Sequence, residues 1–153
     1  MVKEGDMAPQ FSLPDHTGKM RSLYGYKGQK VAIYFYPKDE TSGCTTQGCN
    51  IRDNFEELKK NGIAVLGISK DSVDSHSKFA QHYKFNFPLL SDELGEVLGK
   101  YGVWMEKSMY GRTFMGIHRK TFLIDENGRV VKVIEKPDVG DHAKEIIAGF
   151  AAK

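Results

Sequence analysis

The sequence contains little cysteine, no long apolar run and no block of charge of one sign. None of its apolar runs approaches the roughly 20 residues that a helix needs to cross a bilayer, so we predict no membrane span. The 22 basic and 20 acidic side chains nearly cancel, and the absence of a basic, aromatic-rich block disfavours nucleic-acid binding. The N-terminal segment lacks the apolar core of a signal peptide, and we therefore expect a cytoplasmic protein.

Only two cysteines occur, Cys44 and Cys49, and they do not form a Cys-x-x-Cys motif. In a reducing compartment, such a pair is more typical of catalytic, redox or metal chemistry than of a structural disulfide. The five histidines show no ligand spacing to the cysteines, which disfavours a zinc site with its usual four ligands. No Gly-Lys-Ser/Thr ending follows a glycine-containing loop, which disfavours phosphate binding. We expect neither a metal nor a cofactor.

The 153 residues, 40% of them apolar and 27% charged, are sufficient for one globular domain with a buried core. No internal repeat, low-complexity tract or linker interrupts the chain, so we predict a single domain over residues 1–153.

Strand and helix patterns alternate along the chain. A turn between two short strands is predicted within residues 8–24, and further strands are predicted at 30–36, 63–68, 87–90, 120–125 and 129–134. Helical spacing runs from Cys44 to about Lys60, and further helices are predicted near 73–83, 94–101 and 143–150, the last capped by Asp141. This order predicts an α/β fold with a central mixed sheet, parallel in its middle and ending in an antiparallel hairpin across Asn127-Gly128.

The segment from Gly102 to His118 is predicted to be a loop that is long for a compact domain. Its apolar residues include Trp104, Met105, Met109, Tyr110, Phe114 and Met115. They would form a wall of a substrate pocket, a docking surface for a reductant or second subunit, or a cover over the edge of the core.

Cys44 follows a buried strand and a short loop, at the start of a predicted helix. Helix N-termini present unpaired N–H groups and a partial positive charge, which favour a thiolate. We therefore interpret Cys44 as a nucleophile and Cys49 as its disulfide partner. On an ideal helix their Cα atoms would lie about 8.7 Å apart, whereas a disulfide needs less than about 7 Å. A bond between them requires the first turns of the helix to unwind.

Three motifs together resemble those of the peroxiredoxins. Pro37-x-x-x-Thr41-x-x-Cys44 is similar to the active-site motif of that family, and the position of Cys49 resembles the bacterioferritin-comigratory or Q-type subfamily. The segment 116–125, Gly-Ile-His-Arg-Lys-Thr-Phe-Leu-Ile-Asp, resembles the one that carries the family's active-site arginine, here Arg119. The resemblance extends over nearly the whole chain, and the three motifs in the right order make it specific.

This resemblance implies a thioredoxin-like fold, with the N-terminal β-hairpin as an extension, and a thioredoxin-dependent peroxidase. Cys44 would reduce hydrogen peroxide or an alkyl hydroperoxide and become a sulfenic acid. Cys49 would resolve it as an intrachain disulfide, which thioredoxin or a similar dithiol would reopen. Thr41 would hydrogen-bond the peroxide, Arg119 would hold the thiolate and the developing negative charge, and Pro37 would shield the pocket from water.

Two positions depart from the usual subfamily pattern, because Ser42 stands where proline is common and Gly48 where alanine is common. Both departures remove stiffness beside the cysteines, so we expect them to favour the unwound form. Asp39 and Glu40 add negative charge near Cys44 that opposes its thiolate, and the arginine and the helix end must outweigh them.

Other interpretations stay open. A general disulfide oxidoreductase would use the same cysteines, although no proline precedes the predicted strand 120–125, where thioredoxins place a cis-proline. A redox sensor or holdase would use the disulfide as a switch, and the cysteines would otherwise be small buried hydrophobic residues. We expect a monomer or a weak homodimer. His76 and His82 are predicted to lie on a solvated or half-buried helix face.

Overall fold

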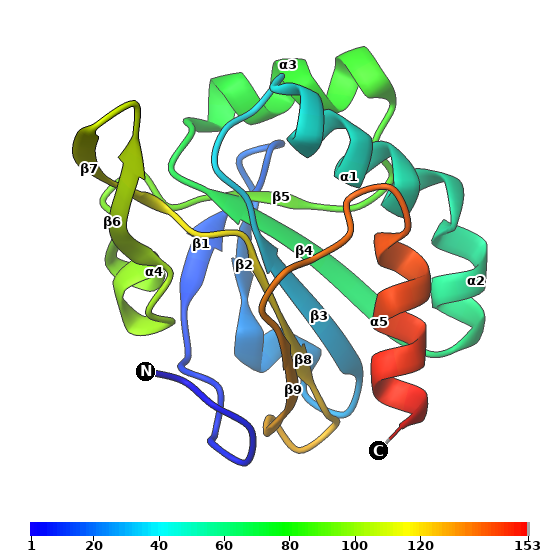
Figure 1. The fold of residues 1–153 in the computed structure, drawn as a ribbon. Coiled ribbons are helices and arrows are strands. Elements are labelled where there is room, and N and C mark those ends of the chain that lie inside the picture. Colours follow the sequence, from blue (N-terminus) through cyan, green and yellow to red (C-terminus); the bar gives the residue numbers. More distant parts are fainter. Residues whose placement is uncertain (153) are drawn as a thin grey trace.

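The computed structural model describes residues 1–152, and a five-stranded sheet lies at its centre (Figure 1). In spatial order the strands are β5 (Leu89–Ser91), β4 (Ile63–Ser69), β3 (Lys30–Phe35), β8 (Lys120–Ile124) and β9 (Val130–Ile134). β3, β4 and β5 pair in parallel, whereas β8 pairs antiparallel with both β3 and β9. The predicted mixed sheet, parallel in its middle and ending in a hairpin, is confirmed.

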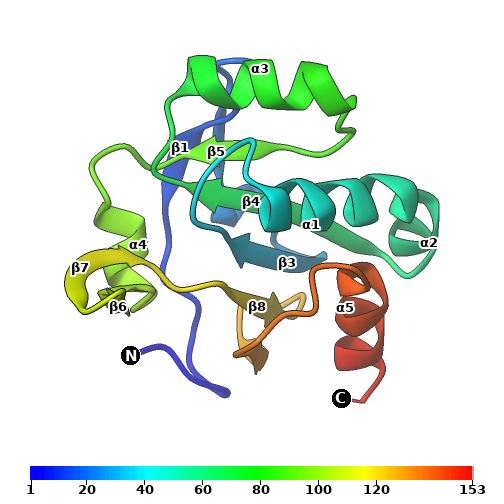
Figure 2. The same cartoon turned by 45° about the horizontal axis from the view of Figure 1, so that its top comes forward.

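Helices cover both faces of this sheet. They are α1 (Ser42–Asp53), α2 (Phe55–Lys60), α3 (Val73–Tyr83), α4 (Glu96–Lys100) and α5 (His142–Ala151), with a short 3-10 helix, η1 (Leu23–Tyr26). Figures 1 and 2 show α1, α2 and α5 together on one side of the sheet, and α4 with the N-terminal segment on the other. Of the helices in residues 1–152, none combines the length and the apolar character that crossing a bilayer would require.

The central strand β3 is buried on both faces, as its nearly continuous apolar sequence predicts. Successive side chains of a strand point to opposite faces. Ala32 and Tyr34 accordingly belong to the core cluster beneath α1 and α5, while Ile33 and Phe35 belong to the cluster on the α4 side. The loop that leads to Cys44 therefore starts from a strand that is packed on both of its faces.

The predicted helix from Cys44 to Lys60 is two helices, because α1 ends at Asp53 and α2 begins at Phe55. Asn54 between them leaves the helical conformation, with φ −109° and ψ 18°. Its side chain donates to the carbonyl of Asn50 at 2.8 Å, and such local competition with the helix is characteristic of asparagine.

The segment from Gly102 to His118 is largely a β-hairpin, so its prediction as a loop was wrong. Its strands are β6 (Trp104–Met109) and β7 (Arg112–Ile117), and they pair antiparallel. Tyr110 and Gly111 connect them, with φ of 52° and 75°. Positive φ at both central residues is what a tight hairpin turn requires. The hairpin lies beside α4 in Figures 1 and 2.

The two ends of the chain bring further elements against the sheet. β1 (Ser12–Pro14) and β2 (Met20–Ser22) form the predicted N-terminal hairpin. At α5, Asp141 occupies the expected cap position but its side chain makes no capping hydrogen bond. Asn50 of α1 supplies that bond instead, because its Oδ1 accepts from the backbone N–H of Ala143 at 2.8 Å.

Candidate active site

Cys44 lies in the first turn of α1, just beyond the carboxyl end of the central strand β3. Thr41 precedes the helix in an extended conformation, with φ −80° and ψ 155°. The first-turn N–H groups of a helix have no intrahelical partners and create a partial positive charge there. Cys44 is only 2% exposed, so a charge on its sulfur needs a partner inside the protein.

Arg119 provides that partner. It directly precedes β8, whose first residue, Lys120, is paired with Phe35 of β3. This register brings the guanidinium group over the start of α1, where its Nη2 donates to Cys44 Sγ at 3.3 Å. A permanently charged donor at this distance favours the thiolate. The predicted nucleophile and the predicted arginine are thus in contact.

Gln47, which no sequence motif indicated, holds the other side of the same guanidinium group. Arg119 Nη1 donates to Gln47 Oε1 at 2.6 Å, and Gln47 is completely buried. Because a carboxamide is neutral, it orients the arginine without cancelling its charge. Gln47 lies three residues after Cys44, so the helical period that places both on one face was the available signal.

Thr41 and Pro37 lie in the loop of residues 37–41, called the active-site loop below. The Thr41 hydroxyl donates to the carbonyl of Lys38 at 2.8 Å. Its hydrogen is therefore engaged, and its oxygen keeps lone pairs that accept from an incoming O–H group. Pro37 is partly buried and forms one wall of a cavity beside this loop.

That cavity, called the site cavity below, has a volume of about 390 Å³. The β6–β7 hairpin forms much of its lining, and Trp104, Phe114 and Ile117 of the hairpin line it together with Pro37. Lys107 lines it as well, and burial together with the charge of Arg119 lowers the pKa of this lysine, against the effect of Cys44. Over residues 1–152, the lining includes neither Cys44 nor Arg119, so the interpretation of this segment as a wall of the substrate pocket stays a prediction.

Cys49 is partly buried and packs against the core cluster beneath α1. Both cysteines are free thiols, and α1 continues without a break from Ser42 to Asp53. A regular helix separates Cα atoms five residues apart by about 8.7 Å, which is too far for a disulfide. The structure is thus the dithiol form of the protein.

Gly48 has a packing role beyond the flexibility that the sequence suggested. A Cβ atom at this position would lie 2.5 Å from Cζ of Phe85. The Phe85 ring therefore occupies the space that an alanine would need, and it packs edge-on against Phe79 at a centroid distance of 4.9 Å. The glycine allows this aromatic ring to contact the backbone of α1 between the two cysteines.

Asp39 of the active-site loop is buried and hydrogen-bonded to His76 of α3, whose Nδ1 lies 2.7 Å from Asp39 Oδ2. His76 is completely buried, so its predicted place on a solvated or half-buried face was wrong, whereas His82 is exposed. Asp39, Asp71 and His76 bring three potential metal ligands within 4.8 Å of one another. Hydrogen bonds within the protein already use Asp39 Oδ2, which accepts from Ser75, and Asp71 Oδ2, which accepts from the Asp39 N–H, as expected for a hydrogen-bonded network.

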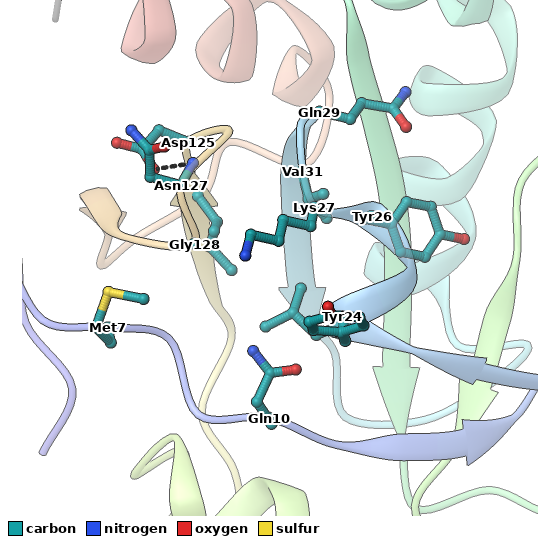
Figure 3. Close-up of a pocket in the computed structure, with 12 residues that line it drawn as sticks. Met7, Gln10, Tyr24, Tyr26, Lys27, Gln29, Val31, Asp125, Asn127 and Gly128 are labelled. Carbon is teal, nitrogen blue, oxygen red and sulfur yellow. Dashed lines mark hydrogen bonds between the residues drawn. The ribbon is translucent and has the colours of Figure 1, made fainter.

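A second cavity, of about 180 Å³, opens at the other end of β3, around Val31 (Figure 3). Lys27 extends into it, and its Nζ lies 5.7 Å from the centre of the Tyr24 ring. Asp125 borders it but accepts the backbone N–H of Asn127 at 2.9 Å. Among the described residues, its lining shares none with the active-site loop or with the site cavity, so this cavity is separate from the redox site.

The chain is similar in sequence and in structure to known proteins over most of its length. A sequence profile described as "AhpC/TSA family" matches residues 4–133. The chain is 50% identical over 141 residues to Peroxiredoxin Bcp of Escherichia coli (strain K12), a match covering 92% of this chain and 90% of that protein. Xanthomonas campestris Peroxiredoxin Q superposes with a TM-score of 0.90 at 37% identity, covering 99% of this chain and 96% of that one. The Xanthomonas campestris bacterioferritin comigratory protein, presented for its alkyl peroxide reduction activity, gives a TM-score of 0.89 at 36% identity, covering 99% and 97%.

Proposed function

This chain belongs to the AhpC/TSA family and is a peroxidase of the bacterioferritin-comigratory or Q-type peroxiredoxins, and we propose that Cys44 is its peroxidatic nucleophile and Cys49 its resolving cysteine. The observation that carries this proposal is the 3.3 Å contact between Arg119 Nη2 and Cys44 Sγ in the first turn of α1. The N-terminal end of the helix and the guanidinium group both stabilise a thiolate at Cys44, and Cys49 follows in the same helix.

The proposed reaction has three steps. The Cys44 thiolate attacks one oxygen of ROOH, the O–O bond breaks, and ROH leaves after the departing oxygen takes up a proton. The product is Cys44 sulfenic acid. The Cys49 thiol then displaces the sulfenic hydroxyl, which forms the S–S bond and releases water. A dithiol reductant reopens that disulfide by exchange, becoming a disulfide itself.

The side chains around Cys44 have distinct roles in this proposal. Arg119 stabilises the thiolate and the negative charge that develops along the O–O bond, and Gln47 keeps its guanidinium group in place. The Thr41 oxygen accepts the O–H of the peroxide and aims the other oxygen at the sulfur. Pro37 limits the access of water from the side of the site cavity.

We propose hydrogen peroxide and alkyl hydroperoxides as substrates. The site cavity starts at Pro37, and its apolar lining from the β6–β7 hairpin suits the organic part of an alkyl hydroperoxide. The solved relative that was presented for alkyl peroxide reduction has the same fold over 97% of its length. A thioredoxin-type protein is the proposed reductant, and the cytoplasm, where such dithiols keep cysteines reduced, is the proposed compartment.

The deciding experiment adds one equivalent of hydrogen peroxide to the full chain and identifies the products by peptide mass spectrometry. We expect an intrachain Cys44–Cys49 disulfide, and sustained turnover when thioredoxin, its reductase and NADPH are supplied. Reduction of insulin disulfides without peroxide consumption would instead indicate a general disulfide oxidoreductase, and one slow oxidation without turnover a sensor.

Two variants separate the roles of the cysteines. Cys44→Ser should abolish peroxide consumption, because no other nucleophile touches Arg119 among the described residues. Cys49→Ser should react once, trap the sulfenic acid as a dimedone adduct and lose recycling by thioredoxin. Normal recycling by Cys49→Ser would disprove the assignment of the resolving cysteine.

A further inference from the structure

His76 of α3 is completely buried, yet both of its ring nitrogens face hydrogen-bond acceptors. Nε2 lies 2.9 Å from the carbonyl oxygen of Leu90, which only accepts, so Nε2 carries a proton. Nδ1 lies 2.7 Å from the carboxylate oxygen Oδ2 of Asp39. The ring therefore needs a second proton, unless the carboxyl group supplies it.

The remaining partners of Asp39 indicate that its carboxyl group is ionised. Tyr36 donates its hydroxyl to Oδ1 at 2.6 Å, and Ser75 donates its hydroxyl to Oδ2 at 2.8 Å. With His76, three donors thus converge on a carboxyl group that is only 5% exposed. Three donors match a carboxylate, which accepts only, and the buried pair is then an imidazolium and a carboxylate.

Asp39 also fixes the active-site loop through its backbone, because its N–H donates to Asp71 Oδ2 at 3.0 Å. The loop is therefore held at this residue five positions before Cys44. A carboxylate is a strong anchor, but its negative charge would oppose a thiolate nearby. The sequence left the compensation of this charge to the arginine and the helix end.

We propose that His76 is a positioning residue for the peroxidase reaction, which neutralises Asp39 so that this carboxylate anchors the active-site loop without suppressing the Cys44 thiolate. The inference rests on the proposed function of Cys44 as the nucleophile. In this proposal the Asp39–His76 pair anchors the active-site loop, and the positive charge of Arg119 stays available to the Cys44 sulfur.

The other charged groups near Cys44 and Asp39 support the pairing of His76 with Asp39 and of Arg119 with Cys44. Arg119 and Lys107 are the cations that face Cys44, and burial raises the pKa of Tyr34 far above its usual range, with the negative charges of Cys44 and Asp39 adding to the rise. The same tyrosine thus lies close to both negative groups. Tyr36, Asp71 and His16 are the further titratable neighbours of His76. The Tyr36 hydroxyl lies 3.3 Å from His76 Nδ1 but donates its hydrogen to Asp39 Oδ1, and Asp71 accepts from Ser69 and from the Asp39 backbone.

The test replaces His76 with a neutral side chain in the full chain. In His76→Gln we expect the thiolate fraction of Cys44 at neutral pH to fall about three- to tenfold, because Asp39 then keeps an uncompensated charge. The measurement is the rate of alkylation by iodoacetamide, with the modified cysteine identified by peptide mass, alongside the rate with hydrogen peroxide. Alkylation reports on the thiolate whether or not the protein reduces peroxide, so it separates this inference from the proposed function.

The decisive comparison is the double variant His76→Gln with Asp39→Asn, which removes both charges. It should restore the alkylation rate to within about twofold of wild type, a rescue that a purely structural role of His76 would not produce. Lys78→Gln is the matched control, because it removes an exposed cation of the same helix that pairs with Asp74 of that helix, and it should alkylate at the wild-type rate.

Two results would overturn the inference. One is a His76→Gln protein that keeps its circular dichroism spectrum and alkylates at the wild-type rate, or whose loss the double variant does not reverse. The other comes from Asp39→Asn alone, which tests the idea even where His76→Gln does not fold. If the imidazolium and the carboxylate cancel each other, Asp39→Asn should alter the thiolate fraction of Cys44 less than about twofold. An increase beyond about threefold would contradict the inference.

Discussion

Arg119 shows how far a motif predicts a site at the scale of single residues. The sequence pointed to Arg119 and Cys44 because each lies in a recognisable motif, and the two side chains are 3.3 Å apart. Gln47 and His76 lie outside any motif and were missed or misplaced. His76 nevertheless shares a helical face with buried residues such as Phe79, so the period of α3 was the signal that could have placed it in the core.

A second buried histidine leads to a prediction about pH. His142 is completely buried, with Nε2 at 2.8 Å from Thr121 Oγ1 and Nδ1 at 2.9 Å from Glu145 Oε1. Burial lowers the pKa of His142 below its usual 6.5, against the raising effect of Glu145. The unfolded chain therefore binds this proton more readily, so the free energy of unfolding should fall as the pH drops below 6.5 and level off below the folded pKa.

Urea unfolding at a series of pH values measures this effect. His142→Gln should lose less stability than wild type over that pH range. Some dependence on pH should remain in both proteins, because burial also lowers the pKa of His16. An unchanged curve for His142→Gln would contradict the prediction.

At the scale of elements, α1 combines a motif that the sequence revealed with packing that it could not reveal. The strand, loop and helix order around Cys44 follows from local patterns, whereas the contact between Gly48 and Phe85 joins residues that lie far apart in the sequence. The β6–β7 hairpin was missed for a local reason. Its Tyr110-Gly111 turn is not a common hairpin dipeptide, and its strands are mostly exposed, so they lack an alternating apolar pattern.

The contact at Gly48 predicts the effect of a small substitution. Gly48→Ala should destabilise the reduced protein by about 1–3 kcal/mol, because the new methyl group would overlap the Phe85 ring. Urea unfolding of the reduced protein measures this cost. Combining the change with Phe85→Leu should give a total smaller than the sum of the two single effects.

Gly99→Ala in α4 is the matched control for this experiment. A Cβ atom at Gly99 would meet nothing within 4 Å, so this change should be neutral or stabilise by up to about 1 kcal/mol. Equal effects of the two glycine substitutions would show that the Phe85 ring does not restrict position 48.

At the scale of the whole molecule, the sheet follows from the sequence because its strands are buried runs separated by helices and clear turns. Most of the site depends instead on the register between β3 and β8, which sets where Arg119 reaches α1. Sequence patterns predict that both strands exist, but pairing between distant segments is decided by tertiary packing. The family resemblance supplied that link for Arg119 alone.

The division between a fixed sheet and a helix that must open leads to a prediction for the oxidised protein. After one equivalent of hydrogen peroxide, the amides of α1 should lose protection from hydrogen exchange, because a Cys44–Cys49 bond is incompatible with the intact helix. The amides of β3, β4 and β8 should keep theirs. Cys49→Ser should show no loss, and a disulfide-bonded protein with fully protected α1 amides would contradict the expected unwinding.

Asn50 gives the opening of α1 a consequence on another side of the fold. This residue directly follows Cys49, and it ties down the start of α5 by accepting from Ala143 N–H and donating to the Gly140 carbonyl at 3.1 Å. Unwinding that draws Cys49 toward Cys44 would detach this tether and leave the first amides of the C-terminal helix without their partner. In each turnover the start of α5 would then detach and bind again. The surface around it would therefore differ between the oxidised and the reduced enzyme.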